Sequence, residues 1–258
     1  MKSRTLAATA AIAGLAGLGL AVAVSSPAQA ATYHRPHISA CSRVAVTMNA
    51  DAVLYQNGHT PLDVDITAPS GQRLGASTGA VQAVDPDGGA HSLANITRVS
   101  PREIEARGTI PASSVPGNWA LDAAVTYVKT SDTSSRTQTC LATTNVRVRK
   151  ATYLYRPTVT RDGDTVNLTG KWTALNAAGT AYVGGRNHSV RIQYKPYNAT
   201  TYTWGSWTNV DTVTTDTGGV ISDSLQHFPG AGDIRTYYAG NSVDSGPSTS
   251  NVAYIAGS

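Results

Sequence analysis

Hydrophobic and polar residues alternate with a period of two along most of the chain beyond residue 40. Such alternation is typical of antiparallel strands that bury one face and leave the other in solvent. Turn-forming Gly, Pro, Asn and Asp separate the alternating runs. The pattern predicts an all-β sandwich, although residues 101–107 fit a short helix as well as a strand. The expected strands lie at 44–48, 62–66, 119–127, 146–148, 166–168, 190–194, 207–213, 220–225, 234–239 and 252–255.

The start of the chain has the three parts of a cleavable secretory signal. Lys2 and Arg4 form a short basic region, and residues 6–24 are uncharged and mostly apolar. Ala28-Gln29-Ala30 then supplies the small residues that precede a cleavage point. We therefore expect a signal peptide at 1–30 and a secreted, extracellular protein that begins near Ala31.

Two other interpretations of this region stay open. The apolar run is near the ~18 residues of a membrane anchor, but its Gly and Ala content and the A-x-A motif favour cleavage. Residues 38–41 resemble a bacterial lipid-attachment motif, but residues 33–37 separate them from the apolar run. We expect a disordered segment at 31–40 and no membrane attachment after cleavage.

The chain contains two cysteines, Cys41 and Cys140. Cysteines in an exported protein form disulfides by default, and two of them allow one intramolecular bridge. Cys41 precedes the first expected strand and Cys140 the last one before residue 151, so the bridge would staple a first domain at 41–150. Two free thiols or an intermolecular bridge are the alternatives. No CxxC or Cys/His spacing indicates a metal site.

The length and the charge of the chain limit how many domains it can form and what kinds of partner it can bind. The length suffices for two domains, and we expect the second at 151–258 after a short junction. The expected signal carries two basic residues and no acid, so its removal lowers the formal net charge from +4 to +2. The nearest basic cluster is Arg147, Arg149 and Lys150, which we expect on a solvated strand edge. We therefore expect a monomer with no nucleic-acid partner.

Several segments of the second half form a recognisable series along the chain. They are Leu168-Thr169-Gly170, Val190-Arg191-Ile192-Gln193-Tyr194, the run from Trp207 to Gly219 with its Thr-Asp-x-x-Gly turn, and the segments 230–240 and 248–254. Together they resemble an immunoglobulin-like module of secreted bacterial proteins over residues 155–258. The sequence departs from the module at Val220-Ile221 and in an insert at 198–206. The first half is similar only through its strand pattern and the two cysteines at its ends. The resemblance implies two tandem immunoglobulin-like β-sandwiches without catalytic residues.

The sequence contains neither a zinc-protease motif nor a histidine pair with metal-ligand spacing. No two of the six histidines are spaced i, i+2 or i, i+4, and the HExxH motif is absent. The pairs Asp85 with Asp87 and Asp162 with Asp164 lie beside Gly in expected turns, where carboxylates ordinarily hold the turn. They leave a calcium-stabilised extracellular module as a minor alternative, although further EF-hand ligands are missing. We expect a non-enzyme without a cofactor.

One segment concentrates aromatic residues. Tyr194, Tyr197, Tyr202, Trp204 and Trp207 lie within fourteen residues. An aromatic loop on a β-sandwich can stack on the apolar faces of sugars while neighbouring Asn and Thr bond hydroxyl groups. Tyr197, Tyr202 and Trp204 are therefore candidate ligand-binding residues. The alternative is that Tyr194 and Trp207 fill the core and the rest forms a hairpin tip.

These observations predict a secreted, non-enzymatic binding or surface-interaction protein with an unidentified protein or glycan partner. The alternative function is an accessory carbohydrate-binding protein that uses the aromatic segment 194–207. An immunoglobulin-like fold by itself assigns neither function.

Overall fold

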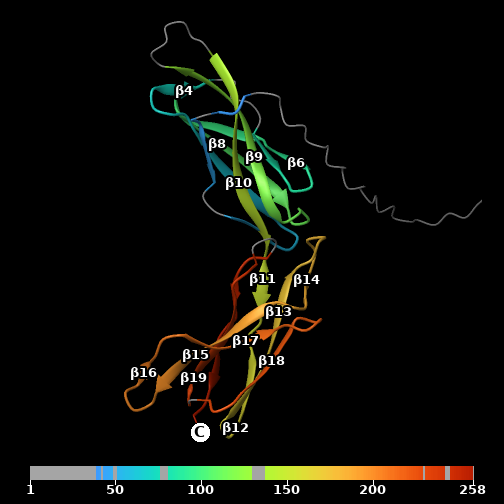
Figure 1. Cartoon of the computed structure of the whole chain (residues 1–258), viewed down its shortest axis with the longest axis vertical. Coiled ribbons are helices and arrows are strands. Elements are labelled where there is room, and N and C mark those ends of the chain that lie inside the picture. The colour runs from blue at the N-terminus through green and yellow to red at the C-terminus, as the bar shows by residue number, and fades with distance from the viewer. Residues whose placement is uncertain are drawn as a thin grey trace, which may run out of the picture. The chain divides into compact units, whose positions relative to one another are not determined.

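The computed structural model describes residues 39–41, 43–48, 51–75, 81–129, 137–228, 230–241 and 245–257. The expected signal at 1–30 and residues 31–38 lie outside this range. Within it every regular element is a strand (Figure 1), which confirms the all-β fold class. Residues 103–111 form a strand, not a helix. None of the described residues belongs to a helix long and apolar enough to span a membrane.

Two sheets form from the first half of the described chain. Their strands pair antiparallel except β2, which runs parallel to β10. One sheet has the order β1-β3-β8-β7, with β1 (Ala45–Met48), β3 (His59–Thr67), β8 (Glu103–Pro111) and β7 (Asn95–Ser100). The other has the order β2-β10-β9-β5-β6, with β4 beside β9; its strands are β2 (Ala52–Leu54), β10 (Thr137–Lys150), β9 (Gly117–Lys129), β5 (Val81–Val84), β6 (Ala90–Leu93) and β4 (Gln72–Leu74).

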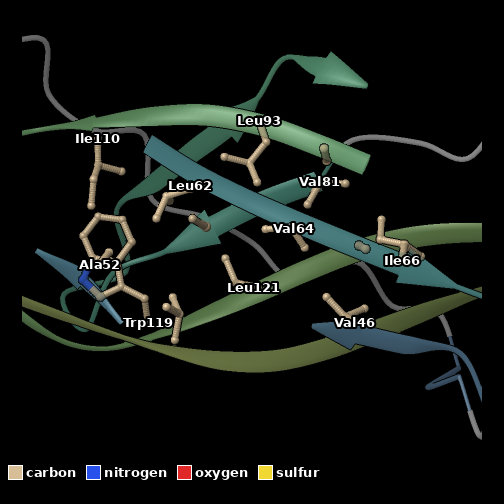
Figure 2. Close-up of a cluster of buried hydrophobic side chains, with 14 of the residues drawn as sticks. Val46, Ala52, Leu62, Val64, Ile66, Val81, Leu93, Ile110, Trp119 and Leu121 are labelled. Atoms are coloured by element: carbon tan, nitrogen blue, oxygen red, sulfur yellow. The ribbon is translucent and has the colours of Figure 1, made fainter. Parts of the chain in front are cut away.

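A hydrophobic cluster fills the space between these two sheets. Leu62 and Val64 of β3 point toward Leu121 of β9 (Figure 2), and all three side chains are fully buried. Trp119 is fully buried beside them, and its indole N–H donates to the Val115 carbonyl at 2.8 Å. Burial of each such side chain contributes about 1.5–3 kcal/mol. The alternation expected at 62–66 is therefore confirmed. The stripe expected at 119–127 is confirmed from Trp119 to Val125, whereas Tyr127 is only half-buried.

Two further sheets form from the second half. β13 (Thr165–Leu175) pairs with β11 (Thr152–Leu154), β12 (Thr158–Asp162), β14 (Tyr182–Val183) and β18 (Val220–Leu225). In the other sheet, β15 (Ser189–Asn198) pairs with β16 (Thr203–Trp204), β17 (Thr208–Thr214) and β19 (Gly232–Tyr238), and β19 pairs with β20 (Ser248–Thr249) and β21 (Ala253–Ile255). The strands expected from residue 207 onward agree with these bounds to within about two residues.

A second hydrophobic cluster lies between these sheets. Val166 and Leu168 of β13 pack in it with Val190 and Ile192 of β15 and Ile234 of β19, and each is at most 1% exposed. The division of the chain into domains at 150/151 stays a prediction.

The disulfide predicted between Cys41 and Cys140 is confirmed, with the two Cα atoms 5.0 Å apart. Backbone hydrogen bonds support it on both sides. The Cys41 N–H donates to the Leu141 carbonyl at 2.8 Å, and the Leu141 N–H donates to the Ser39 carbonyl at 2.9 Å. The segment before β1 is thereby fixed along β10.

Replacing both cysteines with serine is expected to lower the stability of the protein strongly. The bridge spans a sequence separation of 99 residues. In the chain-entropy model a loop of that size stabilises the native state by about 4–5 kcal/mol. We expect a lower midpoint of urea unfolding, measured by tryptophan fluorescence, and a variant that no longer responds to dithiothreitol. A midpoint equal to that of the oxidised wild type would contradict this account.

Candidate functional site

The aromatic segment forms a hairpin between β15 and β17, here called the aromatic hairpin (residues 196–207). β15 pairs with the short strand β16 so that Tyr197 lies opposite Trp204. The Asn198 side-chain oxygen accepts hydrogen bonds from the N–H groups of Thr200 and Thr201 at 3.0 and 3.1 Å, which fixes the turn. In Figure 1 the hairpin, orange at the label β16, extends away from its sheet.

Tyr197 and Trp204 form a cross-strand aromatic pair. Their ring centres are 4.8 Å apart and their planes are inclined by 46°. The Lys195 ammonium lies 5.3 Å from the centre of the Trp204 ring, yet Trp204 remains 44% exposed. The pair therefore presents a partly ordered aromatic surface to solvent.

The other aromatic residues of the segment have separate positions. Tyr202 is 80% exposed, lies in the turn with a φ of 56°, and does not line the groove beside the pair. Tyr194 is buried in the core, as the alternative interpretation of this segment supposes. Trp207 is only half-buried and is absent from the core cluster. That alternative is therefore right for Tyr194 and wrong for Trp207.

An open groove of about 670 Å³ runs beside the aromatic hairpin. The Gly205 N–H donates to the Pro196 carbonyl at 2.8 Å, and a Cβ on Gly205 would lie 2.6 Å from Pro196 Cγ. Glycine at 205 thus permits this close approach. The groove lining combines aromatic rings with small residues and includes Pro196, Tyr197, Asn198, Trp204, Gly230 and Gly257.

Arg161 of β12 hydrogen-bonds the two segments that line the groove opposite the aromatic rings, around Gly230 and around Ala256. Because one guanidinium bonds acceptors that are distant in sequence, it fixes the chain around Gly230 against the C-terminal residues. Sequence reasoning missed Arg161, since its neighbours Asp162 and Gly163 indicate only a turn. The guanidinium donates to the carbonyls of Gly163 at 2.9 Å, Ala256 at 3.0 Å, Gly230 at 3.1 Å and Phe228 at 3.2 Å.

Tyr194 supports the same wall from inside the core. Its hydroxyl donates to the Ala231 carbonyl at 2.7 Å. Burial raises the pKa of Tyr194, although the nearby positive charge of Arg161 opposes that rise. The hydroxyl therefore stays protonated and keeps donating at neutral pH.

Of the four carboxylates considered for calcium, Asp85 holds a turn. Asp85 Oδ1 accepts the N–H groups of Asp87 at 2.9 Å and Gly89 at 2.7 Å, and its Oδ2 lies 3.8 Å from His91 Nε2. No group of three or more His, Cys, Asp or Glu side chains within the described ranges could hold a metal ion.

A bulge in β17 turns one carboxylate toward the inner side of the sheet. Gln193 lies opposite Asn209, but the next residue, Ile192, lies opposite Asp211, so Val210 is the extra residue. Directly opposed residues share a face of the sheet. Asp211 therefore lies on the inner side with the buried Ile192.

Asp211 approaches Asp223 of the neighbouring strand β18. Asp223 Oδ1 accepts the Ser224 N–H at 2.8 Å, whereas Oδ2 is buried and accepts no hydrogen bond from the described residues. Burial raises the pKa of Asp223 and the charge of Asp211 raises it further, while the Ser224 hydrogen bond opposes the rise. Ionised Asp223 is thus less stable here than in water.

Comparisons with known proteins assign no family. No family model and no curated protein matches the chain. Similar solved structures include a DUF4785 family protein from Legionella pneumophila (13% identity, TM-score 0.42, 76% of this chain and 51% of that one). Others are Salmonella alpha-2-macroglobulin (14%, 0.29, 84% and 15%) and the mouse nectin-like molecule 4 ectodomain (10%, 0.24, 83% and 63%). The chain thus spans less than two thirds of each of these proteins.

Replacing Arg161 with Ala is expected to loosen the groove wall and to destabilise the fold. Hydrogen bonds from charged donors contribute about 1.5–3 kcal/mol each when well formed, and partial solvent exposure reduces the total here to about 2 kcal/mol. We expect a lower free energy of unfolding and faster amide exchange at 228–231 and 256. Arg156→Ala, which removes an exposed arginine, is the control and should change neither. Unchanged exchange in Arg161→Ala would contradict the assigned role.

Replacing Asp223 with Asn is expected to stabilise the protein at neutral pH. A carboxyl whose pKa is raised on folding lowers stability as the pH rises from its unfolded pKa, about 3.8, through its native pKa. The gain at pH 7 should stay below about 1 kcal/mol because solvent screens the half-buried site. It should vanish as the pH falls below 4, as measured by thermal unfolding at several pH values. The exposed Asp162→Asn should give no gain; a stabilisation of Asp223→Asn that is independent of pH would contradict the cause given.

Proposed function

We propose that this chain is an exported, non-enzymatic binding protein that holds carbohydrate in the groove beside the aromatic hairpin. The observation that carries the proposal is the composition of this groove. Tyr197 and Trp204 supply aromatic surface, and Gly230 and Gly257 leave room beside it. Aromatic rings with an apolar face and a polar surrounding suit sugar rings, which are themselves amphipathic.

Polar groups at the groove support binding of hydroxyl groups. Asn198 uses its side-chain oxygen to fix the turn. Within the described chain its amide nitrogen donates no hydrogen bond, so both amide hydrogens are available to a ligand oxygen. Because the turn already orders the Asn198 side chain, binding costs little further rotamer entropy.

Two features support export as part of the proposal. Residues 1–30 have the parts of a secretory signal. The Cys41–Cys140 disulfide fits an oxidising compartment outside the cytosol.

The proposal is tested by the migration of the purified protein in native gels that contain neutral polysaccharides such as dextran, xylan or mannan. We expect wild-type protein to be retarded by at least one of them and Trp204→Ala to bind about tenfold more weakly, the scale of a lost aromatic contact. Tyr202→Ala should lose little, because Tyr202 lies outside the groove. Tyr155→Ala, which removes an exposed tyrosine on another strand connection, is the matched control.

Two results would count against the site. Equal retardation of Trp204→Ala and wild type would exclude the aromatic hairpin, and a larger loss in Tyr202→Ala would move binding to the hairpin tip. Both variants replace exposed side chains, so unfolding is not expected to obscure the result.

A further inference from the structure

The outward face of the sheet that carries the aromatic hairpin presents three cations. Burial alternates along β15 and β19, and the residues between the buried positions point away from the core. Arg191 and Lys195 lie at such positions on β15, and Arg235 lies at one on β19. These three residues are called the cationic face. Lys195 joins this face to the hairpin through its contact with Trp204.

Each of these cations lies over an aromatic ring. A cation over an aromatic face is attracted by the electron-rich ring and loses side-chain freedom before any ligand arrives. The distances to the ring centres are 5.9 Å from Arg191 Cζ to Tyr237, 5.3 Å from Lys195 Nζ to Trp204 and 4.1 Å from Arg235 Cζ to Trp207.

Arg235 is the most firmly held of the three. Its Nε donates to Gln193 Oε1 at 2.9 Å, and Gln193 Nε2 in turn donates to Asn209 Oδ1 at 2.9 Å. In the part of the chain that the structure describes, neither terminal nitrogen of Arg235 donates to a protein group. A planar guanidinium with two free terminal nitrogens matches a carboxylate or phosphate group.

The protein does not neutralise the cationic face itself. No ion pair joins Arg191, Lys195 or Arg235 to a carboxylate among the described residues, whereas Arg149 pairs with Asp51 at 3.3 Å. The outward positions of β15, β17 and β19 carry one acid, Asp233, opposite Lys195.

The bulge in β17 keeps a second acid away from this face. In a regular register Asp211 would lie opposite Arg191 on the outward side. The inserted Val210 instead places Thr212 opposite Arg191 and turns Asp211 inward. The face therefore keeps three cations against one carboxylate.

We propose that the cationic face recognises an anionic polysaccharide, whose carboxylate or phosphate groups pair with the cations while sugar rings contact the aromatic hairpin. This inference rests on the proposed carbohydrate-binding function and names the ligand class. Arg191 and Lys195 are about 13 Å apart along the strand, at about 3.3 Å per residue. That span suits successive charges of a polymer better than a single small anion.

The test measures binding of the purified full-length protein by biolayer interferometry to four immobilised probes. Polygalacturonate carries carboxylates, and its fully methyl-esterified form has the same backbone without charge. Phosphomannan carries phosphates on a sugar backbone, and single-stranded DNA is a polyanion without pyranose rings. We expect polygalacturonate or phosphomannan to bind at least tenfold more tightly than the ester, and the preferred probe identifies the anion.

Matched variants assign the preference to the face. Arg235→Gln should weaken binding to the acidic probe about tenfold, the lower end for a charge-assisted hydrogen bond, and should leave binding to the ester unchanged. Arg73→Gln, an exposed arginine on β4, removes the same charge and should change neither. Because Arg235 packs on Trp207, Arg191→Gln repeats the test at an exposed arginine that lies away from the hairpin and donates no hydrogen bond to another described residue. Equal melting temperatures establish that each variant is folded.

The outcomes separate this inference from the function on which it rests. Equal binding to polygalacturonate, phosphomannan and the ester overturns the anionic preference and leaves carbohydrate binding intact. Acidic binding that Arg235→Gln and Arg191→Gln both retain also overturns it. Tighter binding to DNA than to either acidic glycan overturns it in favour of a nucleic-acid ligand. If the wild-type protein binds none of the glycan probes, the proposed carbohydrate-binding function is overturned as well.

Discussion

The rest of the structure depends on the alternation of side chains along each strand. Every second side chain is buried against the core, and the side chains between them face solvent. In β15 the buried Val190, Ile192 and Tyr194 hold the strand against the core. A shift of one residue would bring charged side chains inside, so the core fixes which residues face solvent. Arg191 and Lys195 thus point outward because of their buried neighbours, and a binding surface can be built on that face without further structural elements.

The groove depends on the core in a different way. The groove wall near Gly230 consists of irregular backbone, which lacks the regular interstrand hydrogen bonds that order a sheet. The Tyr194 hydroxyl reaches Ala231 from the core, and Arg161 reaches Gly230 and Ala256 from β12. Long polar side chains on regular strands therefore order a loop wall, whereas the aromatic wall is ordered by the cross-strand pair at Tyr197. Two walls fixed independently of a ligand reduce the entropy cost of binding.

Local patterns predicted the parts of this structure that depend on local physics. The alternation at 62–66 and 190–194 identified buried strands, because burial of one face is visible in the order of residues. The disulfide followed from two cysteines in a chain that begins with the parts of a secretory signal. The contact of Arg235 with Trp207 was not predictable in this way, because it requires β15 to lie between β17 and β19 in a particular register. Strand order is set by long-range packing, which a period-two pattern does not record.

The bulge in β17 is the clearest case in which local stability and the surface character of the sheet oppose each other. By inserting Val210 it removes Asp211 from the side of Arg191, where an opposite charge would stabilise the sheet. Asp211 lies instead near Asp223, whose second oxygen is buried and accepts no hydrogen bond from any described residue, and the two negative charges repel. In a regular strand Asp211 would lie on the other face, away from Asp223, and opposite Arg191, whose charge it would neutralise. The bulge therefore keeps two acids close together and leaves Arg191 without an opposite charge, and both effects disfavour folding. This arrangement is explained if Arg191 binds a ligand, because bulges near functional sites re-aim side chains.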